Sequence, residues 1–199
     1  MKITAIKQQE RFKNRYSIYV DEKYAFSLSA ETLLDEKLVP GQELDAAQLK
    51  AYKKLSADDK AYGLALAYVM RRMRSRGELL DYFRRKQYEP ELQTQILQKL
   101  ENLGQVDDEK FAEAWVRNRR LLKNTSKRRL AQELHAKHVA DDIIQQALET
   151  DETNDQAALQ ELVAKKRRQS RYRDNQKLMQ YLARQGFSYD DIKHELNDA

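Results

Sequence analysis

The sequence predicts a mainly α-helical protein in which tandem three-helix repeats, each similar to a helix-turn-helix module, form an elongated arch next to a small N-terminal β-meander. The first reason is composition: 199 residues contain only five glycines and two prolines, which favours helices joined by short links. The second is that apolar residues recur at helical spacing from Asp45 onward. The third is an internal repeat, because residues 75–97, 126–148 and 174–196 align without gaps.

The aligned stretches share four columns of large apolar residues. The columns are Leu79, Leu130 and Leu178; Phe83, Leu134 and Leu182; Tyr88, Val139 and Phe187; and Leu97, Leu148 and Leu196. A unit of about 45–50 residues that cannot bury an apolar face alone is typical of stacked helical repeats. Chance similarity between amphipathic helices is the alternative, and four matched columns in three copies weigh against it.

The first thirty residues have a different pattern. Short runs rich in Tyr, Ile, Phe and Val alternate within residues 2–29, as in a three-stranded β-meander. Ile18 and Val20 fall on one face of the middle run, and residues 21–23 are expected to form a tight hairpin turn. So small a sheet needs something to pack on. The amphipathic segment 30–38 is the candidate.

The helices after the sheet are expected to begin at residues that cap free backbone N–H groups. The expected starts are Asp45 (with Gln48), Ser56 (with Asp59), Ser75 (with Glu78, a Ser-x-x-Glu capping box), Pro90 and Asp107. Gly104 and Gly186 fall where helices should end.

These signals predict four segments. Residues 1–56 form a β-rich extension with short helices, and residues 57–105, 106–150 and 151–199 form repeats 1, 2 and 3. In the first helix of repeat 1, the spacing of Leu64, Ala67 and Tyr68 predicts the core-facing side.

The sequence lacks the residue patterns on which most catalytic sites depend. It has no cysteine, which excludes disulfides and thiolate metal sites and fits a reducing, cytoplasmic compartment. No glycine-rich phosphate-binding motif is present. His135 and His138 share a helix face, but no further ligand at suitable spacing completes a metal site. We therefore expect a non-enzymatic protein without metal or cofactor and, lacking an 18-residue apolar run, without a membrane span.

Basic residues gather in clusters although the net charge is only +5, from 37 basic and 32 acidic residues. In every repeat the cluster is expected at the end of the first helix and in the link into the second, so stacking would place the clusters in a row along one edge. The candidate binding residues are Arg71, Arg72, Arg74, Arg76, Arg84, Arg85, Lys86, Arg117, Arg119, Arg120, Lys123, Lys127, Arg128, Arg129, Lys165, Lys166, Arg167, Arg168 and Arg171.

Two interpretations of these clusters remain open. Basic residues in a last helical turn complement the helix dipole, which accounts for two or three per repeat but not for six or seven. A basic row fits a polyanion, either a nucleic-acid backbone or an acidic protein surface. Arg outnumbers Lys in the clusters, and Arg binds phosphate or carboxylate bidentately. Tyr172 lies in a basic run, whereas Phe83 and Trp115 fall at core positions, so reading of base sequence is not expected.

Linked motifs within residues 60–198 resemble the RecX family of recombination regulators. Residues 74–119 carry most of the resemblance: a Leu-rich helix ends in a Lys-Gly-Tyr-like stop, here Lys86-Gln87-Tyr88. The step that opens the second repeat in that family is present as Val106-Asp107-Asp108 and Phe111-Ala112. "RRLAQELHAKHV" and "YLARQGF" also match. Gln87 and His138 replace the glycine common at these helix stops, and Gly186 keeps it.

The resemblance implies a regulator that acts in homologous recombination, DNA repair and the SOS response. Members of the family bind the RecA–single-stranded-DNA filament in its groove and restrain its ATPase, coprotease and strand-exchange activities. The implied partners are therefore the RecA filament and single-stranded DNA, contacted directly or through the filament, by a monomer. A general DNA-binding helical-repeat protein and a plain scaffold with a solvated basic edge are the alternatives.

Overall fold

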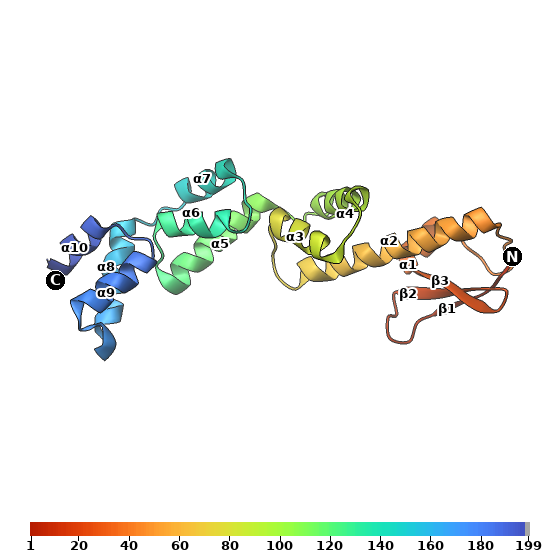
Figure 1. The fold of residues 1–199 in the computed structure, drawn as a ribbon, viewed down its shortest axis with the longest axis horizontal. Coiled ribbons are helices and arrows are strands. Elements are labelled where there is room, and N and C mark those ends of the chain that lie inside the picture. The colour runs from red at the N-terminus through yellow and green to blue at the C-terminus, as the bar shows by residue number, and fades with distance from the viewer. Residues whose placement is uncertain (198–199) are drawn as a thin grey trace. The chain divides into compact units, whose positions relative to one another are not determined.

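The computed structural model describes residues 1–197, which form three strands and ten α-helices (Figure 1). They divide into two compact units. The first unit comprises residues 1–72 and 89–96, and the second comprises residues 73–88 and the described residues from 97 onward.

The first unit begins with the predicted β-meander. Strands β1 (Ile3–Gln8), β2 (Arg15–Val20) and β3 (Lys23–Ser29) form an antiparallel sheet in the order β1-β2-β3. Asp21 and Glu22 in the turn both have left-handed backbone, with φ of 47° and 66°, as a two-residue hairpin of right-handed twist requires. Ile18 and Val20, which the alternation places on one face of β2, are both buried.

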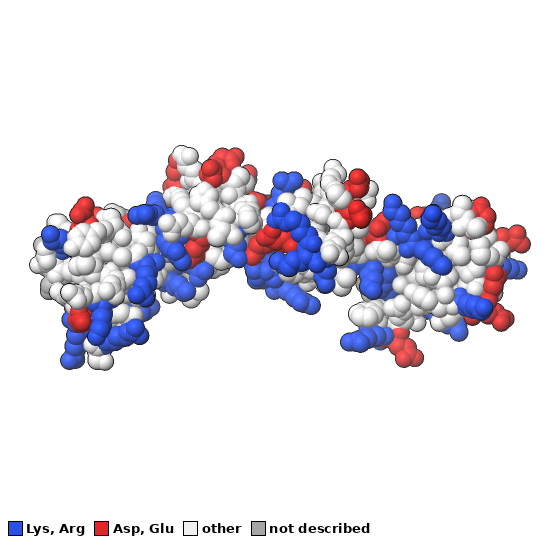
Figure 2. All heavy atoms as spheres, viewed as in Figure 1, with Lys and Arg blue, Asp and Glu red and all other residues white. Residues whose placement is uncertain are grey.

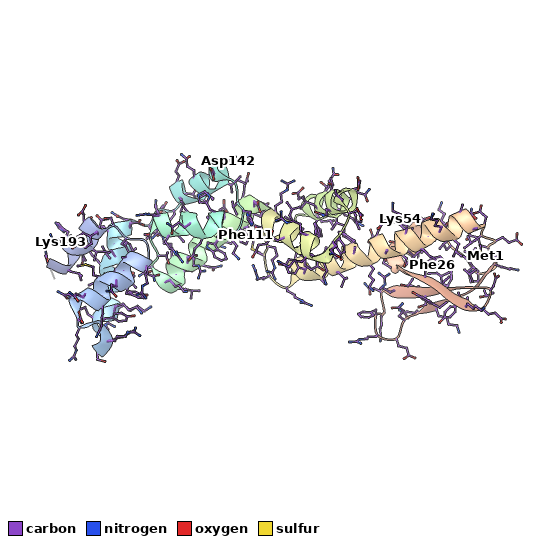
Figure 3. The ribbon with its side chains drawn as sticks, viewed as in Figure 1. Met1, Phe26, Lys54, Phe111, Asp142 and Lys193 are labelled. Atoms are coloured by element: carbon purple, nitrogen blue, oxygen red, sulfur yellow. The ribbon has the colours of Figure 1, made fainter. Side chains whose placement is uncertain are left out.

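Helix α2 (Ala46–Met70) is the main cover of this sheet. Its residues Leu49, Tyr52 and Leu55 pack against the buried side chains of the strands. Phe26 lies on β3 where the strand faces α2 (Figure 3). Its ring stacks on the ring of Tyr52, with the centroids 5.6 Å apart. The segment 30–38 holds the short helix α1 (Ala30–Asp35), which buries none of its residues fully. The expectation that this segment covers the sheet is therefore only partly right.

The predicted helix start at Ser56 is wrong, because α2 runs unbroken for 25 residues from its Asp45–Gln48 capping box. The Ser56 hydroxyl donates to the carbonyl of Ser27 at 2.6 Å and accepts from the Ser27 N–H at 3.3 Å. One turn later, Asp59 accepts from the Ser29 N–H at 2.9 Å. Ser56 and Asp59, which have the spacing of a helix cap, thus form hydrogen bonds with backbone groups of the edge strand β3. On that side the backbone of β3 has no neighbouring strand to pair with.

Asp59 also joins the sheet to α2 through charge. It pairs with Arg15 at 2.7 Å and accepts from the Thr32 hydroxyl at 2.7 Å. Burial raises the pKa of Asp59, but the hydrogen bonds from Ser29 and Thr32 and the charge of Arg15 outweigh it, so the pKa lies below its usual value.

Eight helices follow α2: α3 (Arg76–Lys86), α4 (Pro90–Asn102), α5 (Asp108–Lys123), α6 (Lys127–His135), α7 (Asp141–Glu149), α8 (Asp155–Arg167), α9 (Asn175–Arg184) and α10 (Tyr189–Asn197). A 3-10 helix (Ser170–Tyr172) separates α8 from α9. The fold class of a β-meander followed by three-helix repeats is confirmed, with α2–α4, α5–α7 and α8–α10 as repeats 1, 2 and 3. Within residues 1–197, no helix combines the length and apolarity needed to cross a membrane.

The apolar columns form the cores of the repeats. The first two columns, three leucines and then Phe83, Leu134 and Leu182, are completely buried. In the third and fourth columns, Tyr88 and Leu148 are half-buried and the other members are buried. The prediction for α2 is wrong by one position: Leu64 is 45% exposed, and the buried residues are Ala61, Ala65 and Val69.

A left-handed residue follows the second helix of each repeat, directly after α3 and within three residues of the end of α6 and α9. Gln87, His138 and Gly186 occupy the same column and have φ of 55°, 57° and 92°. The backbone N–H of the next residue then returns to the helix in repeats 1 and 2, as Tyr88 donates to the Phe83 carbonyl and Val139 to the Leu134 carbonyl. The left-handed backbone that glycine favours is therefore present even where Gln87 and His138 replace glycine. A non-glycine residue in this conformation costs a modest amount of free energy.

Consecutive repeats in the second unit meet through one repeated contact. The N-cap Ser75 of α3 donates its hydroxyl to the carbonyl of Lys137, the residue before His138, at 2.6 Å. The N-cap Ser126 of α6 donates to the carbonyl of Gln185, the residue before Gly186, at 3.0 Å. Each serine therefore caps its own helix and binds the helix stop of the next repeat.

Both contacts are tight enough to require a glycine. A Cβ atom on Gly77 would lie 2.3 Å from the Cβ of His138. A Cβ atom on Gly186 would lie 2.4 Å from the Ser126 hydroxyl and 2.7 Å from the Cβ of Arg129. The glycine lies on the earlier repeat in the first contact and on the later repeat in the second.

Candidate polyanion interface

The basic residues of each repeat fall mainly at the end of its first helix and in the link to its second. These first helices end at Met70, Lys123 and Arg167. Arg84, Arg85 and Lys86 form the last turn of α3 instead, just before the left-handed Gln87. The side chains in these positions divide into those held by internal contacts and those left for a partner.

In repeat 1 several basic side chains are paired internally. Arg74 lies 3.9 Å from Glu78, which also pairs with Lys137 of repeat 2 at 2.7 Å. Arg76 pairs with Glu101 at 3.1 Å, and Arg84 pairs with Asp81. Arg71, Arg72, Arg85 and Lys86 are exposed, but Arg72 also has a contact within the chain, and Lys86 Nζ lies 5.9 Å from the centroid of the Tyr82 ring.

Arg120 belongs to the contact between repeats 2 and 3. It is 8% exposed and pairs with Asp151 at 2.7 Å and with Asp155 at 2.9 Å. Its guanidinium also donates to the carbonyl of Thr125. The two carboxylates and the carbonyl occupy the N–H donors of Arg120. Arg120 is therefore not available to bind a partner.

Two other cations of repeat 2 also have structural partners. Lys127 donates from Nζ to the carbonyls of Leu148 and Asp151, both at 2.9 Å, and so caps the C-terminal end of α7. Arg119 pairs with Glu133 at 2.6 Å and lies over the Trp115 ring, 4.6 Å from its centroid.

Two leucines near the C-terminal end of α5 are exposed, close in sequence to the exposed cations of repeat 2. Leu121 and Leu122 are 77% and 71% exposed. Arg117, Lys123 and Arg128 are exposed and form no ion pair within the described residues. Hollows of about 470 and 320 Å³ flank Leu121, the first lined by Val116 and Ala147 among others and the second by Asn124 and Ala158. Arg129, the last cation of this cluster, is exposed and lies 3.6 Å from Glu133.

In repeat 3 the basic cluster has no acidic partner. Residues 165–173 contain six cations, and none of them pairs with an acid in the part of the chain that the structure describes. Lys165, Arg168 and Arg171 are exposed, while Lys166 and Arg167 are half-buried. Figure 2 shows Lys and Arg atoms gathered at the lower end of repeat 3, where α8 leads towards α9, and acidic atoms over α7.

Sequence reasoning overlooked several residues of these surfaces. Leu121 and Leu122 lie outside the four apolar columns, and two leucines inside an acid-free run could have marked them. Tyr181 was also missed, and Arg173, which closes the basic run of repeat 3, is not among the candidate binding residues. The pairing of Arg120 with Asp151 and Asp155 had no sequence signal, because those carboxylates belong to the next link and helix.

Family models match nearly every part of the chain. Residues 1–45 match the RecX N-terminal domain, and residues 61–100, 107–148 and 153–196 match the first, second and third three-helix domains of RecX. The regulatory protein RecX of Bacillus pumilus is 34% identical over 99% of this chain and 77% of its own length. That of Listeria monocytogenes is 31% identical over 100% of this chain and 76% of its own.

Solved structures give the same result. A crystal structure of regulatory protein RecX aligns with a TM-score of 0.74 at 30% identity, over 98% of both chains. The crystal structure of RecX from Lactobacillus salivarius aligns with a TM-score of 0.58 at 26% identity, over 71% of this chain and 95% of that one.

Proposed function

Because the chain belongs to the RecX family of regulatory proteins, we propose that it binds the filament of RecA on single-stranded DNA and inhibits the activities of that filament. The proposal assigns it a role in recombination and DNA repair, as a binding protein in the cytoplasm that acts as a monomer without catalysis or cofactor.

The observation that carries the proposal is the surface of α5 around Leu121 and Leu122. Exposed leucines gain free energy by leaving water, at roughly 25 cal/mol per Å² buried, and they indicate a protein partner. Arg117, Lys123 and Arg128 add positive charge without internal partners. Protein interfaces combine buried apolar side chains with polar and charged ones, and the unpaired cations favour an acidic partner.

ATP hydrolysis by RecA on single-stranded DNA tests the proposal. The parent protein, added at a substoichiometric ratio, is expected to lower the rate. The variant with Arg117→Glu, Lys123→Glu and Arg128→Glu is expected to need at least about tenfold more protein for the same effect, which corresponds to about 1.4 kcal/mol of binding. The rates of parent and variant are compared over the same range of protein concentration.

A variant with Lys50→Glu, Lys53→Glu and Lys54→Glu is the matched control. It makes the same change in net charge at three exposed residues of α2, outside the candidate interface, and is expected to inhibit as the parent does. A parent protein that leaves the rate unchanged would refute the proposal, and equal loss in both variants would remove α5 from the interface.

A further inference from the structure

We propose that the end of α8 and the loop into α9 bind the sugar-phosphate backbone of single-stranded nucleic acid, without reading its base sequence. The inference rests on the proposed function and deepens it, since it assigns the nucleic-acid contact to repeat 3 and leaves the protein contact with α5 of repeat 2.

The first support is charge without compensation. Residues 162–173 contain no acid, and Lys165, Arg168, Arg171 and Arg173 are all exposed with no ion pair in the described chain. Like charges this close repel one another, so a polyanion that neutralises them gains affinity and releases its own counterions.

The second support is that the loop is shaped by its own contacts before any ligand binds. Arg167 donates to the carbonyls of Tyr172 and Arg173, the latter at 3.0 Å, and to the side chain of Asn175 at 2.6 Å. These bonds hold the chain around the 3-10 helix at residues 170–172. One cation therefore orders the loop, and a preorganised loop loses less conformational entropy on binding.

The third support is the aromatic pair beneath the cations. The rings of Tyr172 and Tyr181 lie with centroids 5.2 Å apart. Lys166 Nζ lies 5.4 and 4.6 Å from their centroids, and the Arg171 guanidinium lies 5.9 Å from that of Tyr172. Unstacked bases of a single strand stack on tyrosine rings and guanidinium planes whatever their identity, so this arrangement favours a single strand and no base preference.

The described part of repeat 3 exposes few large apolar side chains that a protein partner could bury. Within the described part of this repeat, Tyr189 on α10 is the one large apolar side chain that is more than 40% exposed. The basic loop therefore offers phosphate-binding groups beside two half-buried tyrosines, whereas α5 offers leucines. This difference between neighbouring clusters favours nucleic acid over an acidic protein at repeat 3.

Fluorescence anisotropy with a labelled oligothymidine of about 20 nucleotides tests the inference without RecA present. The full chain is compared with a variant carrying Lys165→Gln, Arg168→Gln and Arg171→Gln. Each phosphate contact on a single strand contributes about 0.7 to the slope of log affinity against log salt. Loss of three contacts should lower the slope by about 2 and weaken binding at about 50 mM salt by tenfold or more.

The matched control removes three charges from repeat 2 by Arg117→Gln, Lys123→Gln and Arg128→Gln, and its slope should fall by less than about 0.7. A mixed-sequence oligonucleotide should bind the parent within about threefold of oligothymidine.

Circular dichroism checks that the repeat 3 variant is folded. If the triple variant unfolds, the double variant with Arg168→Gln and Arg173→Gln takes its place. An unchanged slope in the folded repeat 3 variant, an equal loss in the control, or no DNA binding by the parent would overturn the inference. This experiment measures binding to DNA without RecA, whereas the ATPase experiment measures inhibition of RecA. Failure of the inference can therefore be distinguished from failure of the proposed function.

Discussion

Ser75 and Lys137 lie 62 positions apart in the sequence and are joined by a 2.6 Å hydrogen bond from the serine hydroxyl to the lysine carbonyl. Because Ser126 and Gln185 form the same contact one repeat later, a small polar residue at a helix start holds two repeats together at each junction.

Replacing Ser75 with Ala should lower the free energy of unfolding by about 1–3 kcal/mol, because the helix cap and the bond to the next repeat are both lost. Ser188→Ala is the control: Ser188 accepts from the Asp191 N–H at the start of α10 and is exposed. It should cost about 1 kcal/mol or less. Equal losses in urea unfolding would show that the bond to Lys137 contributes nothing to stability.

Gly77→Ala should destabilise the protein by about 1–3 kcal/mol, because the new methyl group would overlap His138 and must displace backbone. Gly63→Ala in α2 is the control, since a Cβ atom there has no atom within 4 Å. That change should instead stabilise the helix by roughly 0.5–1 kcal/mol. Thermal unfolding of the two variants should therefore shift in opposite directions, and a shared direction would contradict the tight contact.

Arg120→Gln should cost about 3 kcal/mol or more, since Asp151 would remain buried without its counter-charge. Arg117→Gln removes the same charge three residues away, where the side chain is exposed, and should change stability by less than about 0.5 kcal/mol. Chemical denaturation of both variants checks this. A mild effect at Arg120 would return that residue to the candidate binding set.

The pairing of Asp59 should make the stability of the first unit depend on pH. The folded pKa of Asp59 lies below the 3.8 of an unperturbed carboxyl group. The pairing therefore stabilises the fold fully above that value, and the stabilisation is lost as the pH falls from 3.8 through the folded pKa. Asp59→Asn should weaken the protein at pH 7 by about 2 kcal/mol and reduce its further loss in acid. Asp58→Asn, a change one residue away, should preserve the pH profile of the parent.

The sequence was sufficient for features that depend on local pattern. The columns that begin with Leu79 and Phe83 are buried because burial imposes the same residue type on each repeat. The caps at Ser75 and Asp107 form because they need only the next three residues.

The sequence was insufficient to predict contacts in which a side chain binds a distant part of the chain. Ser56 and Asp59 have the spacing of a helix cap, but their partners lie on β3, about thirty positions earlier. Arg120 belongs to a basic run, but its partners lie more than thirty positions later. Local spacing carries no information on such partners, so the number of available cations was overestimated.

The two junctions between repeats impose an order on them. At the first junction Gly77 packs against His138, and at the second junction Gly186 packs against Ser126 and Arg129. A second copy of repeat 2 placed after the first would put a histidine at the position of Gly186, where a Cβ atom has no room beside Ser126 and Arg129. The repeats are thus not interchangeable parts: each junction accepts only its own neighbour, and a duplication or exchange of repeats would fail at this pair of positions while every core column still matched.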